Sequence, residues 1–273
     1  MVASENTFRR DPYNGWLVLC RIIFYPLTAL LARRRFGGHE HLRVDGAVLL
    51  VANHVSHIDP VYDAVFVRKS SRWPHFMAKA SLWKVPVLGT VMRGTDQIPV
   101  ERAGGGAGKQ SLDAAEAALR AGKVVLIYPE GTITRDPQTW PMRPKAGAAL
   151  LALSGDFPVV PLVNWGTQKV FVPYVKRGRI KPLPRKDVVV KAGPAIDLSA
   201  YRGKPVDARL LRDVSMVIME AVRDLVAEVR GEEAPETFFV PRKADAEAVK
   251  EAEASEFVAE PTARPEAEGN ATS

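Results

Sequence analysis

A histidine and an aspartate stand five positions apart in the segment 53–60 (NHVSHIDP), directly after the apolar run 47–52 (AVLLVA). On a regular helix, five residues turn a side chain by roughly 500°, which leaves it about 140° from the starting face. His54 and Asp59 can therefore meet only if the chain makes a tight turn between them. An aspartate that accepts the proton of one imidazole nitrogen leaves the other nitrogen able to take a proton from an alcohol. The spacing predicts a general base, His54, oriented by Asp59.

Two alternatives stay open for this segment. Pro60 is typical of the first turn of a helix, so Asp59 is expected to be the N-cap of the helix that follows, and capping alone would explain an aspartate there. In that interpretation His54 is an ordinary turn histidine. His57 is a second candidate for the base, but it stands only two residues from Asp59 and is expected on the opposite side of the turn.

The rest of the chain predicts the elements that position these residues. Short apolar runs alternate with helical patterns, which is a βαβ rhythm. It predicts an α/β fold with a mixed, largely parallel sheet flanked by helices. Strands are expected near 47–52, 75–79, 97–100, 123–128, 158–163 and 186–192, and helices near 60–69, 108–121, 145–154 and 210–229.

Polar residues follow several of these strands, and ligands gather at the carboxyl ends of parallel strands. The segment 128–135 (YPEGTITR) follows one strand; its glycine permits close backbone approach to a ligand and its threonine supplies a hydroxyl. The segment 94–102 (GTDQIPVER) ends in an arginine, and 159–163 (VVPLV) is apolar with a proline. The candidate binding residues in the segment 128–135 are Glu130, Gly131 and Thr132.

The His-x4-Asp pattern and these three segments resemble, in the same order, the four sequence blocks of the glycerolipid acyltransferase superfamily, which includes bacterial 1-acylglycerol-3-phosphate acyltransferases. The resemblance covers about residues 47–165. It implies transfer of a fatty acyl group from acyl-CoA or acyl carrier protein to the free hydroxyl of 1-acylglycerol 3-phosphate. The product would be phosphatidic acid, in phospholipid biosynthesis. His54 and Asp59 would be catalytic, and no metal or cofactor beyond the acyl thioester would be needed.

The resemblance also assigns roles on the acceptor side. Arg102 matches the arginine that contacts the acceptor's phosphate, and a planar guanidinium suits phosphate because it donates two parallel hydrogen bonds. Lys79 stands where the family tends to carry a lysine near that phosphate. Glu130 is expected to bind an acceptor hydroxyl or to hold a neighbouring arginine, with a purely structural ion pair as the alternative. Two positions depart from the pattern: Tyr128 replaces the usual phenylalanine, and Ile133 replaces a common arginine, which makes Arg135 the candidate for the displaced cation.

Two other functions remain open. The same chemistry could act on a different acceptor, such as a glycolipid, a lyso-aminolipid or glycerol 3-phosphate, because the departure at Ile133 lies on the acceptor side. A non-catalytic lipid-binding protein on the same fold is the other alternative. The presence of His54, Asp59, Arg102 and Glu130 together counts against it.

Charge is distributed unevenly along the chain. The net charge is +7, but residues 231–273 hold eleven acids and four bases, so residues 1–230 carry +14. A basic body predicts anionic partners, such as lipid headgroups and phosphorylated substrates. Nucleic acid is not expected as a partner, because no helix-turn-helix, zinc finger or aromatic-studded RNA-binding strand is recognisable. The single Cys20 excludes an internal disulfide and a multi-cysteine metal site, and fits a reducing interior.

The chain divides into three predicted parts. Residues 1–40 contain the apolar stretch 16–32, interrupted by Arg21 and Pro26 and followed by three arginines at 33–35. This pattern favours an anchor lying in the interface at the cytoplasmic face of the membrane over a spanning helix. A helix packed on the domain's own core is the alternative. Residues 41–230 form the predicted acyltransferase domain, and 231–273 an acidic disordered tail.

Overall fold

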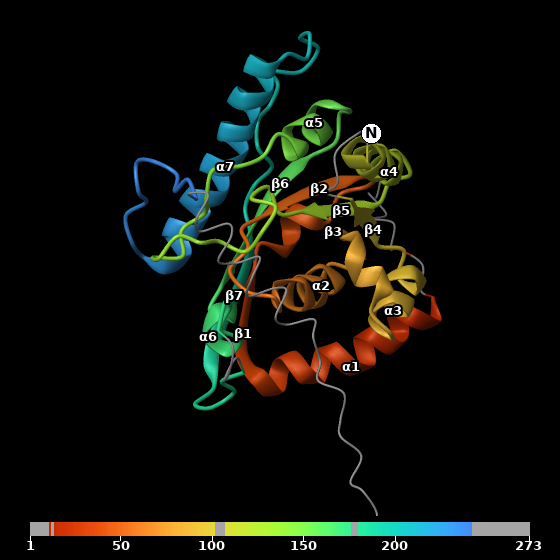
Figure 1. The fold of residues 1–273 in the computed structure, drawn as a ribbon, viewed down its shortest axis with the longest axis vertical. Coiled ribbons are helices and arrows are strands. Elements are labelled where there is room, and N and C mark those ends of the chain that lie inside the picture. The colour runs from red at the N-terminus through yellow and green to blue at the C-terminus, as the bar shows by residue number, and fades with distance from the viewer. Residues whose placement is uncertain (1–10, 12–13, 102–106, 176–179, 242–273) are drawn as a thin grey trace, which may run out of the picture.

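The computed structural model describes residues 11, 14–101, 107–175 and 180–241 (Figure 1). The predicted strands and helices are present, with ends shifted by at most two residues. The strands are β1 (Ala32–Gly37), β2 (Val48–Ala52), β3 (Pro74–Lys79), β4 (Ile98–Val100), β5 (Val124–Ile127), β6 (Val159–Trp165) and β7 (Lys186–Ala192). The helices are α1 (Gly15–Leu31), α2 (Asp59–Lys69), α3 (Leu88–Gly94), α4 (Ala107–Arg120), α5 (Gly147–Leu153), α6 (Thr167–Val170) and α7 (Ala208–Arg230), with 3-10 turns η1 (His39–Leu42) and η2 (Ala80–Lys84).

The described strands form one sheet in the order β1-β7-β6-β2-β5-β3-β4. All neighbouring pairs run parallel except β6 and β7, which are antiparallel. The prediction of a mixed, largely parallel sheet flanked by helices is therefore confirmed. The central strands β2, β5 and β6 point the same way, so the loops after all three lie at one edge of the sheet.

Helices cover both faces of the sheet, which explains the unbroken apolar run of β2. Leu49 and Val51 pack against α4, α5 and α7 on one face. Val48, Leu50 and Ala52 pack with α2 on the other. Figure 1 shows α7 and α5 on the opposite side of the strands from α2. With every residue of β2 buried, the loop that follows it is fixed in position.

The N-terminal region differs from the expected separate anchor. The arginines at 33–35 lie in β1, an edge strand that pairs with β7, so the sheet begins before the boundary expected at residue 40. Arg33 and Arg35 alternate along the strand and both bond the Asp187 carboxylate, at 2.7 and 3.3 Å. Within the described ranges, no helix is both long and apolar enough to cross a membrane.

The region after α7 also differs from the expected disordered tail. Phe239 pairs with Met142 in an isolated parallel bridge, and the Arg143 amide donates to the Phe239 carbonyl at 3.0 Å. Phe238 lies under the Arg223 guanidinium, 5.2 Å from its carbon to the ring centroid. Residues 232–241 therefore fold back onto the domain, while 242–273 lie outside the described residues.

Candidate active site

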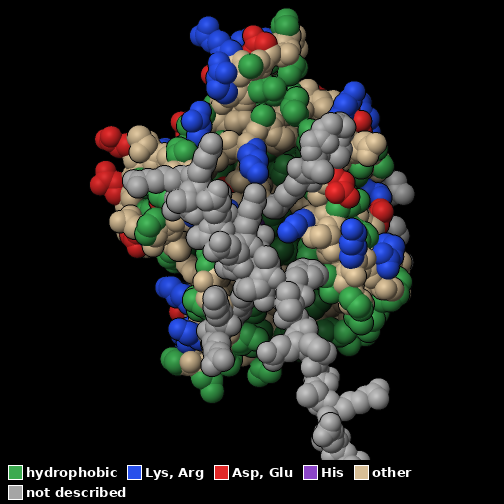
Figure 2. All heavy atoms as spheres, in the orientation of Figure 1, with side chains coloured by type: hydrophobic (Ala, Val, Ile, Leu, Met, Phe, Trp, Pro, Cys, Tyr) green, Lys and Arg blue, Asp and Glu red, His purple; other side chains and the backbone are tan. Residues whose placement is uncertain are grey.

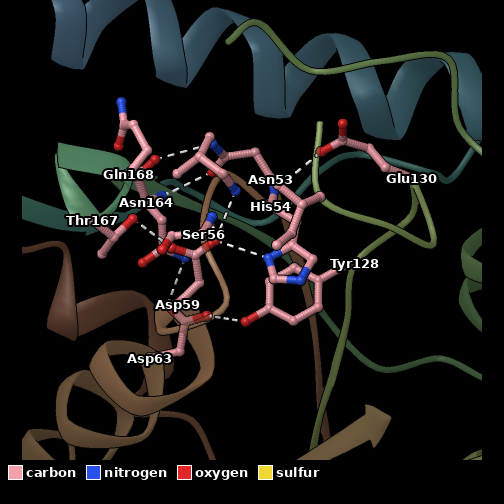
Figure 3. A network of polar contacts seen from close by, with 12 residues as sticks. Asn53, His54, Ser56, Asp59, Asp63, Tyr128, Glu130, Asn164, Thr167 and Gln168 are labelled. Carbon is pink, nitrogen blue, oxygen red and sulfur yellow. Dashed lines mark hydrogen bonds and ion pairs between the residues drawn. The ribbon is translucent and has the colours of Figure 1, made fainter. Parts of the chain in front are cut away.

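Loops at the carboxyl ends of three strands build the candidate site (Figure 3). His54 follows β2, Tyr128 and Glu130 follow β5, and Thr167 follows β6. The Asn53 side chain joins the loop after β2 to strand β6, because its oxygen accepts from the Asn164 amide at 2.8 Å and its nitrogen donates to the Asn164 carbonyl at 3.0 Å. The site therefore rests on the rigid middle of the sheet.

His54 and Asp59 meet, as their spacing predicts. The imidazole Nδ1 lies 2.8 Å from Asp59 Oδ2, which also accepts the backbone N–H groups of Val55 at 2.7 Å and Ser56 at 2.8 Å. The other carboxylate oxygen accepts the hydroxyl of Thr167. Asp59 is fully buried, whereas 16% of the His54 side chain is exposed. Four donors face the two oxygens of Asp59, an arrangement that fits an acceptor-only carboxylate. Such a carboxylate holds the imidazole proton on Nδ1 of His54, which leaves Nε2 as the acceptor.

The predicted N-cap role of Asp59 is wrong. The N-cap of α2 is Ile58, and Asp59 is the first helical residue. Its carboxylate turns back to the amides of Val55 and Ser56 instead of capping the amides ahead of it in the helix. His57 lies away from this bond, with its ring edge-on to Phe171 at a centroid distance of 5.8 Å.

Glu130 has a different set of contacts from those expected of it. Its oxygens accept the backbone N–H groups of His54 at 3.0 Å and Met142 at 2.9 Å. The side chain is 2% exposed, and this burial raises the pKa of the carboxyl to about 8. These two bonds account for both carboxylate oxygens without an acceptor hydroxyl or an arginine, and they join the loop that carries His54 to the loop before α5.

The raised pKa of Glu130 predicts a specific pH dependence of stability. Between about pH 4.5 and 8 the unfolded chain has released this proton and the folded chain still binds it. Stability should therefore fall as pH rises through this window, by roughly 1.4 kcal/mol per pH unit from this group in mid-window. In Glu130→Gln, which cannot ionise, denaturant unfolding at pH 5, 6 and 7 should show a shallower decline than the native chain. Parallel declines in both proteins would contradict the assignment.

Sequence reasoning missed three polar partners of the site. Tyr128 stacks on the His54 imidazole with ring centroids 4.1 Å apart and planes 16° apart. Its hydroxyl donates to Asp63 at 2.6 Å, and Asp63 accepts from the Asn164 side chain at 2.8 Å. Thr167 is the third. The sequence does contain a clue to Asp63, because it stands four residues after Asp59 and so lies on the same face of α2. The only clue to Thr167 is that it follows a strand that ends at this edge of the sheet.

The predicted cationic residues are placed as follows. Lys79 is the last residue of β3, is exposed, and stands at the same edge of the sheet as His54. Arg135 is half-buried, and its Nε is buried without a hydrogen-bond partner among the described residues. Ile133 is 4% exposed, so an arginine there could not extend outwards without moving the loop. Arg102 lies outside the described residues.

The turn 130–132 is shaped by Gly131, whose φ is +71°. A Cβ at Gly131 would come within 2.8 Å of the Lys145 ammonium nitrogen, so glycine there makes room for that side chain. Thr132 is half-buried in the same turn. No group of three His, Cys, Asp or Glu side chains that could hold a metal ion occurs in the part of the chain that the structure describes.

Known proteins resemble this chain in sequence and fold. The Acyltransferase family model matches residues 33–165. A 1-acyl-sn-glycerol-3-phosphate acyltransferase of Chlamydomonas reinhardtii is 29% identical over 182 residues, 66% of this chain and 51% of that protein. The Bacillus subtilis 1-acyl-sn-glycerol-3-phosphate acyltransferase is 28% identical over 127 residues, covering 46% and 60% of the two chains. A chloroplastic one from Brassica napus is 29% identical over 126 residues, 46% of this chain and 35% of its own length.

The fold matches a solved structure. The crystal structure of the 1-acyl-sn-glycerophosphate acyltransferase PlsC from Thermotoga maritima aligns with a TM-score of 0.59 and 24% identity, over 77% of this chain and 80% of that one. The alignments to the curated relatives span about a third to three fifths of those proteins' lengths. The family match covers β1 to β6 and contains His54, Asp59, Tyr128 and Glu130, so the part of the chain that carries the candidate site is similar to the Acyltransferase family.

Proposed function

We propose that this protein transfers a fatty acyl group from an acyl thioester to the free hydroxyl of 1-acylglycerol 3-phosphate, forming phosphatidic acid in phospholipid biosynthesis. The observation that carries the proposal is the His54 Nδ1 contact with buried Asp59 at 2.8 Å, which leaves Nε2 as the acceptor nitrogen of a partly exposed side chain. The choice of 1-acylglycerol 3-phosphate as the acceptor is supported by the names of the relatives, which are 1-acyl-sn-glycerol-3-phosphate acyltransferases.

The proposed reaction needs no acyl-enzyme. His54 Nε2 takes the proton of the acceptor hydroxyl while that oxygen forms a bond to the thioester carbonyl carbon. Asp59 stabilises the imidazolium that results. The tetrahedral intermediate then collapses, the carbon–sulfur bond breaks, and the imidazolium returns its proton to the leaving thiolate. General base catalysis of this kind contributes about 10²–10⁴ in rate.

The acceptor's phosphate would be held by cations. Lys79 ends β3 at the same edge of the sheet as His54, and Arg102, outside the described residues, matches the arginine of the family's second sequence block. Arg135 follows the 130–132 turn, and its buried unpaired Nε suits an anionic ligand. Gly131 and Thr132 would line the approach of the phosphate. The route uses acyl-CoA or acyl carrier protein as co-substrate and no further cofactor, and nucleic acid has no part in it.

We further propose that the protein docks on the cytoplasmic face of the membrane through α1 and the tip before α3. The large apolar side chains exposed there are Trp16, Val18, Leu19, Ile22, Ile23, Tyr25, Leu27 and Leu30 on α1, with Val87 and Leu88. Figure 2 shows apolar side chains gathered along the lower edge of the molecule, where Figure 1 places α1 and α3. An apolar surface of this extent, on an otherwise basic body, suits the interface of an anionic bilayer.

Contacts between α1 and α3 make this a single surface. The Asn14 side chain donates to the Gly94 carbonyl at 3.1 Å, and a Cβ on Gly94 would lie 2.3 Å from the Trp16 ring. Val87 is 78% exposed and has a φ of +64°, a strained conformation for a β-branched residue. Strain at an exposed apolar tip supports a role for that tip in binding.

Leu30→Glu is expected to lower binding to vesicles that contain phosphatidylglycerol by about tenfold, because it removes an apolar side chain that is 72% exposed and adds a negative charge. Val206→Glu is the matched control: Val206 is 55% exposed in the loop before α7, and binding should not change. Co-sedimentation with vesicles of phosphatidylglycerol and phosphatidylcholine measures both. Equal losses in the two variants would contradict the docking surface.

The activity is tested with labelled acyl thioester and a panel of acceptors. Phosphatidic acid from 1-acylglycerol 3-phosphate is the expected main product, read by mass spectrometry of the lipids formed. The panel includes glycerol 3-phosphate, a lyso-aminolipid and a glycolipid, because buried Ile133 replaces an arginine that the family commonly carries on the acceptor side. Preference for one of these would reassign the acceptor. Absence of transfer to every acceptor would leave only a lipid-binding role.

A further inference from the structure

Two residues next to the catalytic histidine, the half-buried Tyr128 and the buried Asp63, have no part in the mechanism above. The Tyr128 hydroxyl donates to Asp63 at 2.6 Å, and the face of its ring covers the His54 imidazole at 4.1 Å. Asp63 is fully buried, and its other oxygen accepts from Asn164 at 2.8 Å. A buried carboxyl group is expensive unless it is hydrogen-bonded, so this arrangement calls for an explanation.

The geometry connects both orienting contacts of His54 to one helix. Asp59 and Asp63 are one turn apart on α2 and lie on the same face of it. Asp59 binds the edge of the imidazole through Nδ1. Asp63 holds the phenol whose face covers the ring, as Figure 3 shows. A single hydrogen bond at Nδ1 leaves the imidazole able to rotate about that bond, whereas a ring stacked on its face opposes the rotation.

We propose that Asp63 and Tyr128 form a positioning pair that fixes the plane of the His54 ring and so keeps Nε2 directed at the acceptor hydroxyl. This inference rests on the proposed acyl transfer. Neither residue touches the substrate in this arrangement. The pair acts through the imidazole. The hydroxyl of Tyr128 is essential to it, because a phenylalanine would supply the same ring without the hydrogen bond to Asp63.

The electrostatics of the pair agree with a positioning role. Burial, with the nearby Asp59 charge, raises the pKa of Asp63 well above its usual range. Burial also raises the pKa of Tyr128, and the charge of Asp63 adds to that shift. Both shifts go in the direction that favours the neutral form of each side chain.

Tyr128→Phe is the first test. We expect kcat to fall about fivefold, the equivalent of a typical net hydrogen bond, with KM for acceptor and donor within about twofold. Tyr62→Phe is the matched control. Tyr62 precedes Asp63 on α2 and is buried, but its hydroxyl donates to the Thr28 carbonyl at 3.3 Å, away from His54. The kcat of the Tyr62→Phe variant should match that of the native chain. An unchanged kcat in Tyr128→Phe would overturn the inference.

Two more variants separate positioning from stability. Asp63→Asn keeps an oxygen for the phenol, and the Asn164 side chain can turn its buried, unpaired Oδ1 to the new amide, so its kcat loss should be smaller than that of Tyr128→Phe. The triple variant Tyr128→Phe, Asp63→Leu and Asn164→Leu removes all three side-chain partners together, so none of them is left unpaired. We expect it to regain thermal stability over Tyr128→Phe while kcat stays low. Recovery of kcat together with stability would show a purely structural role and refute the positioning pair.

A readout without substrate makes the inference independent of the proposed reaction. With 15N-labelled histidine, the solvent exchange of the His54 Nδ1 proton is measurable by NMR. Exchange should be about fivefold faster in Tyr128→Phe than in the native chain and unchanged in Tyr62→Phe, because a less restrained ring breaks its bond to Asp59 more often. Equal exchange in the native chain and Tyr128→Phe would count against the pair even if acyl transfer is confirmed. Faster exchange with no acyl transfer would support the pair and count against the proposed function.

Discussion

Replacing His54 with alanine is expected to lower kcat for acyl transfer by about 10²–10⁴, because no other described group lies where it could take the acceptor's proton with Asp59 as its partner. The fold should survive the change. The side chain is partly exposed, and the backbone N–H of residue 54 would still donate to Glu130. Initial rates with saturating acceptor and donor, together with thermal unfolding, measure both effects.

His57→Ala is the control for this prediction. The two histidines stand three positions apart in one loop, but His57 contacts Phe171 and lies away from the Asp59 bond. Its kcat should stay within about threefold of the native value. A large loss in His57→Ala with a small one in His54→Ala would move the base to residue 57, the rival that the sequence alone leaves open.

The fold was largely predictable because its central strands are unambiguous. β2 and β5 are short, unbroken apolar runs bounded by glycine and polar residues, which is typical of strands buried on both faces. Strand β1 was not predictable, since three consecutive arginines have no apolar pattern. It becomes a strand by pairing with β7 along all six of its residues, with Arg33 and Arg35 bonding Asp187 across the pair, and no local signal encodes that pairing.

The site was predictable only where its members are close in sequence. His54 and Asp59 are joined by one turn, so their spacing alone constrained the geometry. Thr167 reaches Asp59 across 108 positions, and Tyr128 reaches Asp63 across 65. Such contacts depend on the order of strands in the sheet, which periodicity does not give. Glu130 shows a related limit: the sequence placed a carboxylate at the edge of the site but could not show that backbone amides occupy both of its oxygens.

Asp59 allows the catalytic and structural roles of one carboxylate to be separated. Asp59→Ala should destabilise the fold by about 3–5 kcal/mol, because it leaves the buried N–H groups of Val55 and Ser56 and the imidazole Nδ1 without an acceptor. Denaturant unfolding measures this loss. Thr167→Val removes only the hydroxyl that bonds the other oxygen, and its smaller loss, of about 1 kcal/mol, is the matched comparison.

Asp59→Asn should keep most of the stability and still lose about 10²–10³ in kcat. Its carbonyl oxygen can face the three N–H donors, and its NH2 group can face the Thr167 hydroxyl, which is able to rotate and accept. Nδ1 then remains hydrogen-bonded, but no negative charge stabilises the imidazolium that forms when the acceptor loses its proton. A stable Asp59→Asn protein with native kcat would show that the charge is dispensable, and that Asp59 serves the reaction only by shaping the turn that carries His54.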